Sequence, residues 1–151
     1  MKRYYLYLWA LILLTFSSLT LQSCRTEEQQ TVSCFPSSPI SVVLDLNYPA
    51  YYDLQNINGW IYVDEQQCGT KGLIVVRTTN GFKIYDRNAP HLCPDGDNTK
   101  LEVNANIKVV CPKDNAEWIL LTGEPIAVSQ VPPRTYPYTY NPTSKILSIY
   151  Y

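Results

Sequence analysis

Four residues whose side chains bind metals or form disulfides occur in two short segments of the chain. His91 and Cys93 belong to His-Leu-Cys-Pro, and Cys111 and Asp114 belong to Cys-Pro-Lys-Asp. Each segment follows an expected β-strand, so both are expected to be loops. Imidazole, thiolate and carboxylate groups are ligands of transition metals, and two neighbouring thiols can instead form a disulfide. If the two loops meet at one end of a β domain, the four side chains predict a metal site or a disulfide.

The elements that would position these loops are expected to be short strands. Apolar residues alternate with polar ones in short runs separated by turn residues, and no stretch shows sustained helical periodicity. Thr79-Asn80-Gly81 is a hairpin signal between two such runs, and residues 51–58 are expected to hold one helical turn or a loop. The pattern predicts one all-β domain, a small antiparallel sandwich or barrel. The expected strands cover residues 40–46, 60–63, 72–78, 82–86, 101–103, 107–110, 117–121, 136–140 and 146–150.

The first 23 residues resemble a bacterial lipoprotein signal peptide. A positive start at Lys2-Arg3 precedes an almost wholly apolar stretch, residues 4–21, and Leu-Gln-Ser-Cys then ends at Cys24. The resemblance implies cleavage before Cys24, acylation of Cys24 by chains such as palmitate, and a membrane anchor without a membrane-spanning segment. The alternative is a retained signal anchor, since about 18 apolar residues can just span a bilayer.

This reading divides the chain into three parts. Residues 1–23 are the signal peptide, residues 24–39 are the lipidated cysteine and a polar tether, and residues 40–151 are the β domain. The expected location is the cell envelope, with the lipid in the outer membrane of a Gram-negative bacterium and the domain periplasmic or surface-exposed. Glu27-Glu28 resembles the acidic export signal of surface lipoproteins, although an acidic tether has the same composition.

The order of elements in the second half of the domain resembles that of Rieske-type [2Fe-2S] proteins. Residues 111–125, CPKDNAEWILLTGEP, are similar to the family's second cluster-binding loop, the aromatic strand after it and a Thr-Gly-x-Pro turn. A proline pair at 132–133 and two terminal strands follow in the family's order. The similarity covers about residues 40–151. It implies a Rieske-like fold and a [2Fe-2S] cluster.

The ligand residues depart from the family's pattern. The family's first loop is Cys-x-His, whereas this chain has His91-x-Cys93; the second is Cys-x-x-His, where Cys111 matches and Asp114 takes the place of histidine. The resemblance implies His91, Cys93, Cys111 and Asp114 as ligands. Rieske centres have potentials of about −150 to +300 mV because two neutral imidazoles bind one iron. An anionic carboxylate in place of an imidazole would stabilise ferric iron and lower that potential.

The alternatives to a cluster are a disulfide and a mononuclear ion such as zinc. With Cys24 assigned to lipid, four of the five cysteines remain, and an even number outside the cytoplasm favours disulfides. We expect Cys93 to pair with Cys111, which leaves Cys34 with Cys68. Four cysteines permit three pairings, and the sequence does not select among them.

Charge and motifs exclude several classes of function. The 12 basic residues include Lys2 and Arg3, so the chain after residue 23 has 10 basic against 13 acidic residues and a net charge of −3. Nucleic acid is not an expected partner because no basic stripe is present. Nor is enzymatic activity expected, since the chain lacks Gly-x-Ser-x-Gly, phosphate-loop and dinucleotide motifs, and no third group is evident to orient His91 beside Cys93.

Two hypotheses of function therefore stand. In the first, a membrane-anchored Rieske-like lipoprotein transfers electrons or senses redox state through a [2Fe-2S] cluster, with an unknown redox partner. In the second, a cluster-free domain held by disulfides is a structural module or a surface module that binds a protein partner or a glycan. The 13 tyrosines fit a binding surface, and equally the half-buried face of a sheet.

Overall fold

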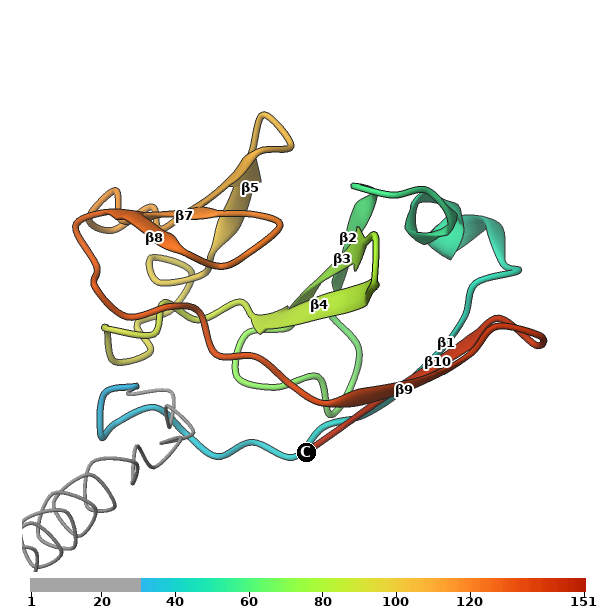
Figure 1. Ribbon diagram of the computed structural model, residues 1–151. Coiled ribbons are helices and arrows are strands. Elements are labelled where there is room, and N and C mark those ends of the chain that lie inside the picture. Colours follow the sequence, from blue (N-terminus) through green and yellow to red (C-terminus); the bar gives the residue numbers. More distant parts are fainter. Residues whose placement is uncertain (1–30) are drawn as a thin grey trace, which may run out of the picture.

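The computed structural model describes residues 31–151, which form ten short strands and one 3-10 helix (Figure 1). The expected signal peptide and Cys24 lie outside the described residues. Within residues 31–151, no helix has the length and apolar character needed to cross a membrane. The elements in chain order are β1 (Ser41–Asp45), η1 (Pro49–Gln55), β2 (Trp60–Val63), β3 (Leu73–Thr78), β4 (Gly81–Asp86), β5 (Glu102–Asn104), β6 (Lys108–Val110), β7 (Glu117–Ile119), β8 (Pro125–Ala127), β9 (Tyr138–Asn141) and β10 (Ile146–Tyr150).

The strands form three antiparallel sheets, with orders β1-β10-β9, β2-β3-β4 and β5-β6-β7-β8. In Figure 1 the β2-β3-β4 sheet lies between the other two, with β5–β8 on one side and the long β1-β10-β9 ribbon on the other. This architecture confirms the predicted all-β antiparallel class.

Strand β3, in the middle of the central sheet, is buried on both faces over residues 73–76. In β3, Leu73 and Val75 pack into a core shared with β1 and β10, whereas Ile74 and Val76 pack into a second core shared with the β5–β8 sheet. A strand buried on both faces is a continuous apolar run rather than an alternating one, as in the Leu-Ile-Val-Val sequence here. Burying each such side chain contributes about 1.5–3 kcal/mol to the stability of the fold. Because β3 contributes side chains to both cores, its sheet joins the two halves of the domain.

The β3–β4 hairpin is the predicted one. Thr78 pairs with Gly81 across the turn, and Gly81 has a φ of 145°, which L side chains rarely adopt. A Cβ atom at this position would collide with the Tyr138 hydroxyl, which accepts a hydrogen bond of 2.9 Å from the Phe82 N–H. Glycine is therefore required both by the turn and by the close approach of β9.

Several boundaries differ from the expected ones. The expected helical turn is a 3-10 helix that begins at Pro49. Strand β8, which the sequence did not predict, begins with a proline and pairs with β7 next to an irregularity in register. The tyrosine-rich strand begins at Tyr138 rather than at Tyr136, because the Tyr136 side chain turns inward and bonds a buried carboxylate.

That carboxylate is Asp86, which is fully buried at the end of β4. It accepts hydrogen bonds from the Tyr136 hydroxyl at 2.7 Å, the Thr70 N–H at 2.9 Å and the Asn88 N–H at 2.7 Å. A buried charge is tolerated only when donors compensate for its lost hydration. Asp86 thus ties two segments that are distant in sequence, at Thr70 and Tyr136, to the place where the chain leaves the central sheet.

Replacing Tyr136 with Phe tests this arrangement. Loss of one hydrogen bond to a buried charged group is expected to reduce the free energy of unfolding by about 1.5–3 kcal/mol at pH 7. Burial and then the nearby Asp86 raise the pKa of Tyr136 above its ordinary value of 10.0. The folded state therefore retains the phenolic proton longer than the unfolded state, and stability present below pH 10 is lost as the pH rises further.

Urea unfolding at pH 7 and above pH 10 measures both effects. Tyr136→Phe should lose less stability than the wild type over this interval, although the buried Tyr85, whose pKa burial also raises, preserves part of the pH dependence. The control is Tyr150→Phe, because this side chain is 47% exposed. An unchanged alkaline loss in Tyr136→Phe would contradict the prediction.

Candidate functional site

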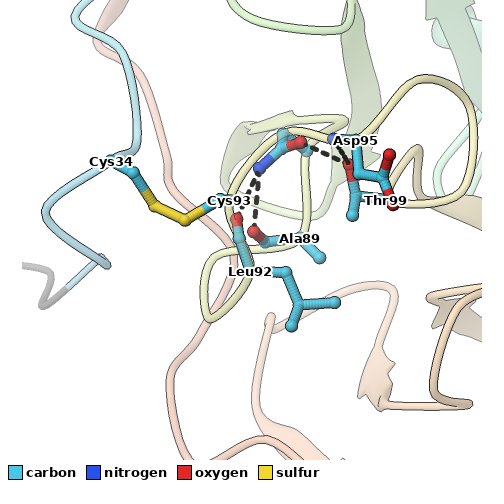
Figure 2. Close-up of a disulfide and its surroundings, with 7 residues drawn as sticks. Cys34, Ala89, Leu92, Cys93, Asp95 and Thr99 are labelled. Carbon is cyan, nitrogen blue, oxygen red and sulfur yellow. Dashed lines mark hydrogen bonds between the residues drawn. A yellow bond between two sulfur atoms is a disulfide. The ribbon is translucent and has the colours of Figure 1, made fainter.

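The loop that carries His91 and Cys93 is organised by the buried side-chain amide of Asn88. Its Nδ2 donates to the carbonyl oxygens of Ala89 at 2.9 Å and Leu92 at 3.1 Å, and its Oδ1 accepts from the Thr99 hydroxyl at 2.8 Å. Figure 2 shows Ala89, Leu92 and Thr99 gathered around these bonds. Asn88 was not predicted as a site residue. The only feature in the sequence that indicates its role is the polar run Asp-Arg-Asn directly after a buried strand.

The second loop is closed on itself by backbone hydrogen bonds. The Asn115 N–H donates to the Cys111 carbonyl, and the Cys111 N–H donates to the Ala116 carbonyl, both at 2.9 Å. Asn115 has a left-handed φ of 60°, which asparagine tolerates better than most residues. Asp114 Oδ1 accepts from the Ala116 N–H at 3.1 Å, so the carboxylate is held over the loop.

The two loops meet through His91 and Asp114. His91 Nε2 lies 2.6 Å from Asp114 Oδ2, and the imidazole packs 5.7 Å from the Trp118 ring centroid. The predicted convergence of the two loops is confirmed for these residues. Within residues 31–151, the buried Nδ1 of His91 has no hydrogen-bond partner. Burial alone would raise the pKa of Asp114, but hydrogen bonds from His91, the Ala116 N–H and Cys111 bring this pKa below its ordinary value.

Cys111 lies beneath this pair and is fully buried. Burial, followed by the effect of the Asp114 carboxylate, raises the pKa of the Cys111 thiol, while backbone N–H groups of Lys113 and Asp114 partly oppose the shift. A thiol with a raised pKa is protonated at neutral pH, and the thiolate is the form that binds metals or acts as a nucleophile. Burial and the Asp114 carboxylate thus both oppose formation of the Cys111 thiolate.

Cys93 forms a disulfide with Cys34, with an S–S distance of 1.96 Å and a Cα–Cα distance of 5.4 Å (Figure 2). The expected pairs, Cys93 with Cys111 and Cys34 with Cys68, are therefore wrong. Cys111 belongs to the core beside the β5–β8 sheet, whereas Cys68 belongs to the core beside β1 and β10, and both are free and buried.

The approach of Cys34 to the first loop has a local cause. The Val32 N–H donates to the Pro90 carbonyl at 3.1 Å, so the segment leading into the domain runs alongside the loop that carries Cys93. Both cysteines lie at the surface, and the bond closes across 59 residues of sequence.

These residues do not fit a [2Fe-2S] cluster. Of the predicted ligand set, the structure brings together His91, Asp114 and Cys111, but the Cys93 sulfur is bonded to Cys34. A Rieske-type cluster needs two thiolates on one iron, and a single buried thiol remains. Within residues 31–151, no group of three or more His, Cys, Asp or Glu side chains is arranged to hold a metal ion.

Comparisons with known proteins find little. No protein-family model matches the chain, and no curated protein matches it. Among solved structures, the ferredoxin of carbazole 1,9a-dioxygenase from Nocardioides aromaticivorans IC177 is similar, with 19% sequence identity over 75% of this chain and 97% of that chain and a TM-score of 0.43. The all-β class is established by the chain's own three sheets.

Removal of the disulfide is expected to destabilise the domain. In the chain-entropy model, a cross-link that closes a loop of this length restricts the unfolded chain by about 4 kcal/mol. Cys34→Ser and Cys93→Ser should each lower the free energy of unfolding by an amount of this order, measured by urea denaturation of oxidised protein. Cys68→Ser, which removes a thiol but no disulfide, is the control and should cost clearly less. Equal stability of Cys34→Ser and the wild type would contradict the assignment.

Proposed function

We propose that this chain is a cluster-free, disulfide-held β domain that a lipid on Cys24 anchors to the cell envelope, where it serves as a surface binding module. The observation that carries the proposal is the bond between Cys34 and Cys93. It occupies one of the two thiols that a Rieske-like cluster would require. Structural disulfides also belong to oxidising compartments, which agrees with the lipoprotein signal expected from the sequence.

The disulfide also limits how far the domain can lie from its anchor. Cys34 lies ten positions after Cys24 in sequence, and an extended chain spans at most about 3.3–3.6 Å per residue, so this interval reaches at most roughly 35 Å. The loop containing Cys93 would then face the membrane. In Figure 1 the described chain begins at the end of the molecule opposite to the tip of the β5–β6 hairpin and η1, which would therefore face away from the membrane.

The two loops that would hold a cluster in a Rieske-like protein are held in place here by contacts between protein groups. The imidazole of His91 and the carboxylate of Asp114 bind each other at 2.6 Å, and Cys111 packs in the core below them. Both loops are also tied by their own backbone and amide hydrogen bonds. The domain thus has a source of loop order that does not depend on metal, in support of a binding role rather than electron transfer.

Iron and acid-labile sulfide analysis tests this proposal against electron transfer. The chain is purified anaerobically from a reducing host, in which the Cys93 thiol is also free, and its visible spectrum is recorded. We expect colourless protein without stoichiometric iron or sulfide, because Cys111 is fully buried and His91 and Asp114 bind each other. Stoichiometric iron and sulfide that disappear in Cys111→Ser would contradict the proposal. Incorporation of labelled palmitate by the wild type, and its absence in Cys24→Ser, tests the anchor separately.

A further inference from the structure

A groove of about 630 Å³ lies beside Trp60, the first residue of strand β2. Its walls come from η1 and the turn that follows it, from β2, and from the turn between β5 and β6. The volume lies within the range of about 300–1,000 Å³ typical of small-ligand sites. The lining residues that matter here are Asp53, Asn56, Asn58, Trp60, Tyr62 and Asn106.

Two aromatic side chains of the groove are fixed in position. The Trp60 indole N–H donates to Asn106 Oδ1 at 2.9 Å, and the Tyr62 hydroxyl accepts from the Val103 N–H at 2.7 Å. The two rings pack edge to face with centroids 4.9 Å apart. The β5–β6 hairpin thus holds both rings before any ligand arrives, and such preorganisation reduces the entropy lost on binding.

Both rings have surface left to contact a ligand, since Trp60 is partly exposed and Tyr62 is 37% exposed. The Arg87 guanidinium lies 3.7 Å from the centroid of Tyr62 and covers one of its faces. Trp60 is half-buried, packing partly against the second core, and it lines the groove with its remaining surface.

The polar groups of the groove are free to bind a ligand. Asp53, Asn56 and Asn58 are exposed, and their side chains make no hydrogen bond to any residue within 31–151. Asn106 uses its Oδ1 for Trp60, which leaves its Nδ2 as a donor. Carboxamide and carboxylate groups together supply donors and acceptors in neighbouring positions, as needed to bind several hydroxyl groups at once.

The charge of the groove excludes anionic ligands. Asp53 is the only charged residue that lines it, and the lining contains no lysine or arginine. Phosphate, carboxylate and nucleic acid ligands would therefore meet a negative charge with no compensating cation. An indole face beside uncharged amides suits instead a ligand with an apolar C–H face and a rim of hydroxyl groups.

We infer that this groove binds a neutral oligosaccharide, with one sugar ring stacked on Trp60 and its hydroxyl groups bonded to Asp53, Asn56, Asn58 and Asn106. The inference rests on the proposed function as a surface binding module and names its ligand class. The ligand is held by stacking and hydrogen bonds alone, and no bond is made or broken.

The experiment titrates the purified chain with cellohexaose, xylohexaose and mannohexaose, and follows the indole N–H signals by ¹⁵N-resolved NMR. At least one of these sugars should shift the Trp60 signal in a saturable manner. The Trp118 signal is an internal control, because its indole is fully buried and donates to the Val131 carbonyl at 2.8 Å. The sequence contains three tryptophans, so Trp60→Phe identifies the Trp60 signal and Trp118→Phe identifies the Trp118 signal.

Variants separate binding from folding. Trp60→Ala and Asn106→Ala should weaken the affinity about tenfold or more, which corresponds to about 1.4 kcal/mol. Because Trp60 also contacts the core, Asp53→Ala supplies a surface variant that leaves the core intact and should weaken binding as well. Tyr150→Ala is the matched aromatic control, since Tyr150 is 47% exposed on β10 and does not line the groove.

The absence of a saturable shift with all three sugars overturns the inference, as does unchanged affinity in Trp60→Ala and Asp53→Ala. These results are distinguishable from failure of the proposed function. Colourless protein that binds none of the sugars leaves the cluster-free domain standing and removes only the ligand class. Protein with stoichiometric iron and sulfide removes the cluster-free domain, whatever the groove binds.

Discussion

The bond between Cys34 and Cys93 is the constraint on which the interpretation of this domain depends. It joins the segment that enters the domain to the loop of His91 and Cys93, the first of the two loops in which a metal site or a disulfide was expected. The two cysteines are 59 residues apart in sequence. The next residue, Phe35, is held by a cation–π contact, because the Arg134 guanidinium lies 5.4 Å from its ring; the same guanidinium lies 4.5 Å from the Tyr151 ring. Val32, Cys34 and Phe35 therefore contact the domain that is expected to begin at residue 40.

The central sheet explains how the two ends of the molecule take different roles. Its two faces contribute to separate cores, so the β5–β8 sheet and the β1-β10-β9 sheet are both attached to it but not to each other. At one end the loops of His91 and Asp114 close on each other by an imidazole–carboxylate contact. At the other, the tip of the β5–β6 hairpin reaches Trp60 and leaves a groove between elements that are distant in sequence. The loops of His91 and Asp114 are therefore held together by their own side chains, whereas the groove beside Trp60 is open to a ligand.

The parts of the fold that local chemistry determines were predictable from the sequence. The hairpin at Gly81 follows from a residue that tolerates positive φ, and strand β3 follows from an uninterrupted apolar run. The cysteine pairing was not predictable, because it depends on the path of residues 31–39 over the first loop, and that path is set by contacts such as Val32 with Pro90. The resemblance to Rieske-type loops placed the two loops together correctly but led to the wrong partner for Cys93. The groove was missed for a related reason, since Trp60 and Asn106 are 46 residues apart and no local pattern joins them.

Disulfide mapping tests the central claim most directly. The chain is isolated from an oxidising compartment, its free thiols are alkylated in a denaturant that exposes the buried cysteines, and it is cleaved with trypsin and Asp-N without reduction before mass spectrometry. Cleavage before Asp45 and Asp64 separates Cys34 from Cys68, and cleavage after Lys100 and Lys108 separates Cys93 from Cys111. The account predicts a peptide pair linked through Cys34 and Cys93, with Cys68 and Cys111 alkylated. A pair linked through Cys93 and Cys111, or an alkylated Cys93, would contradict it.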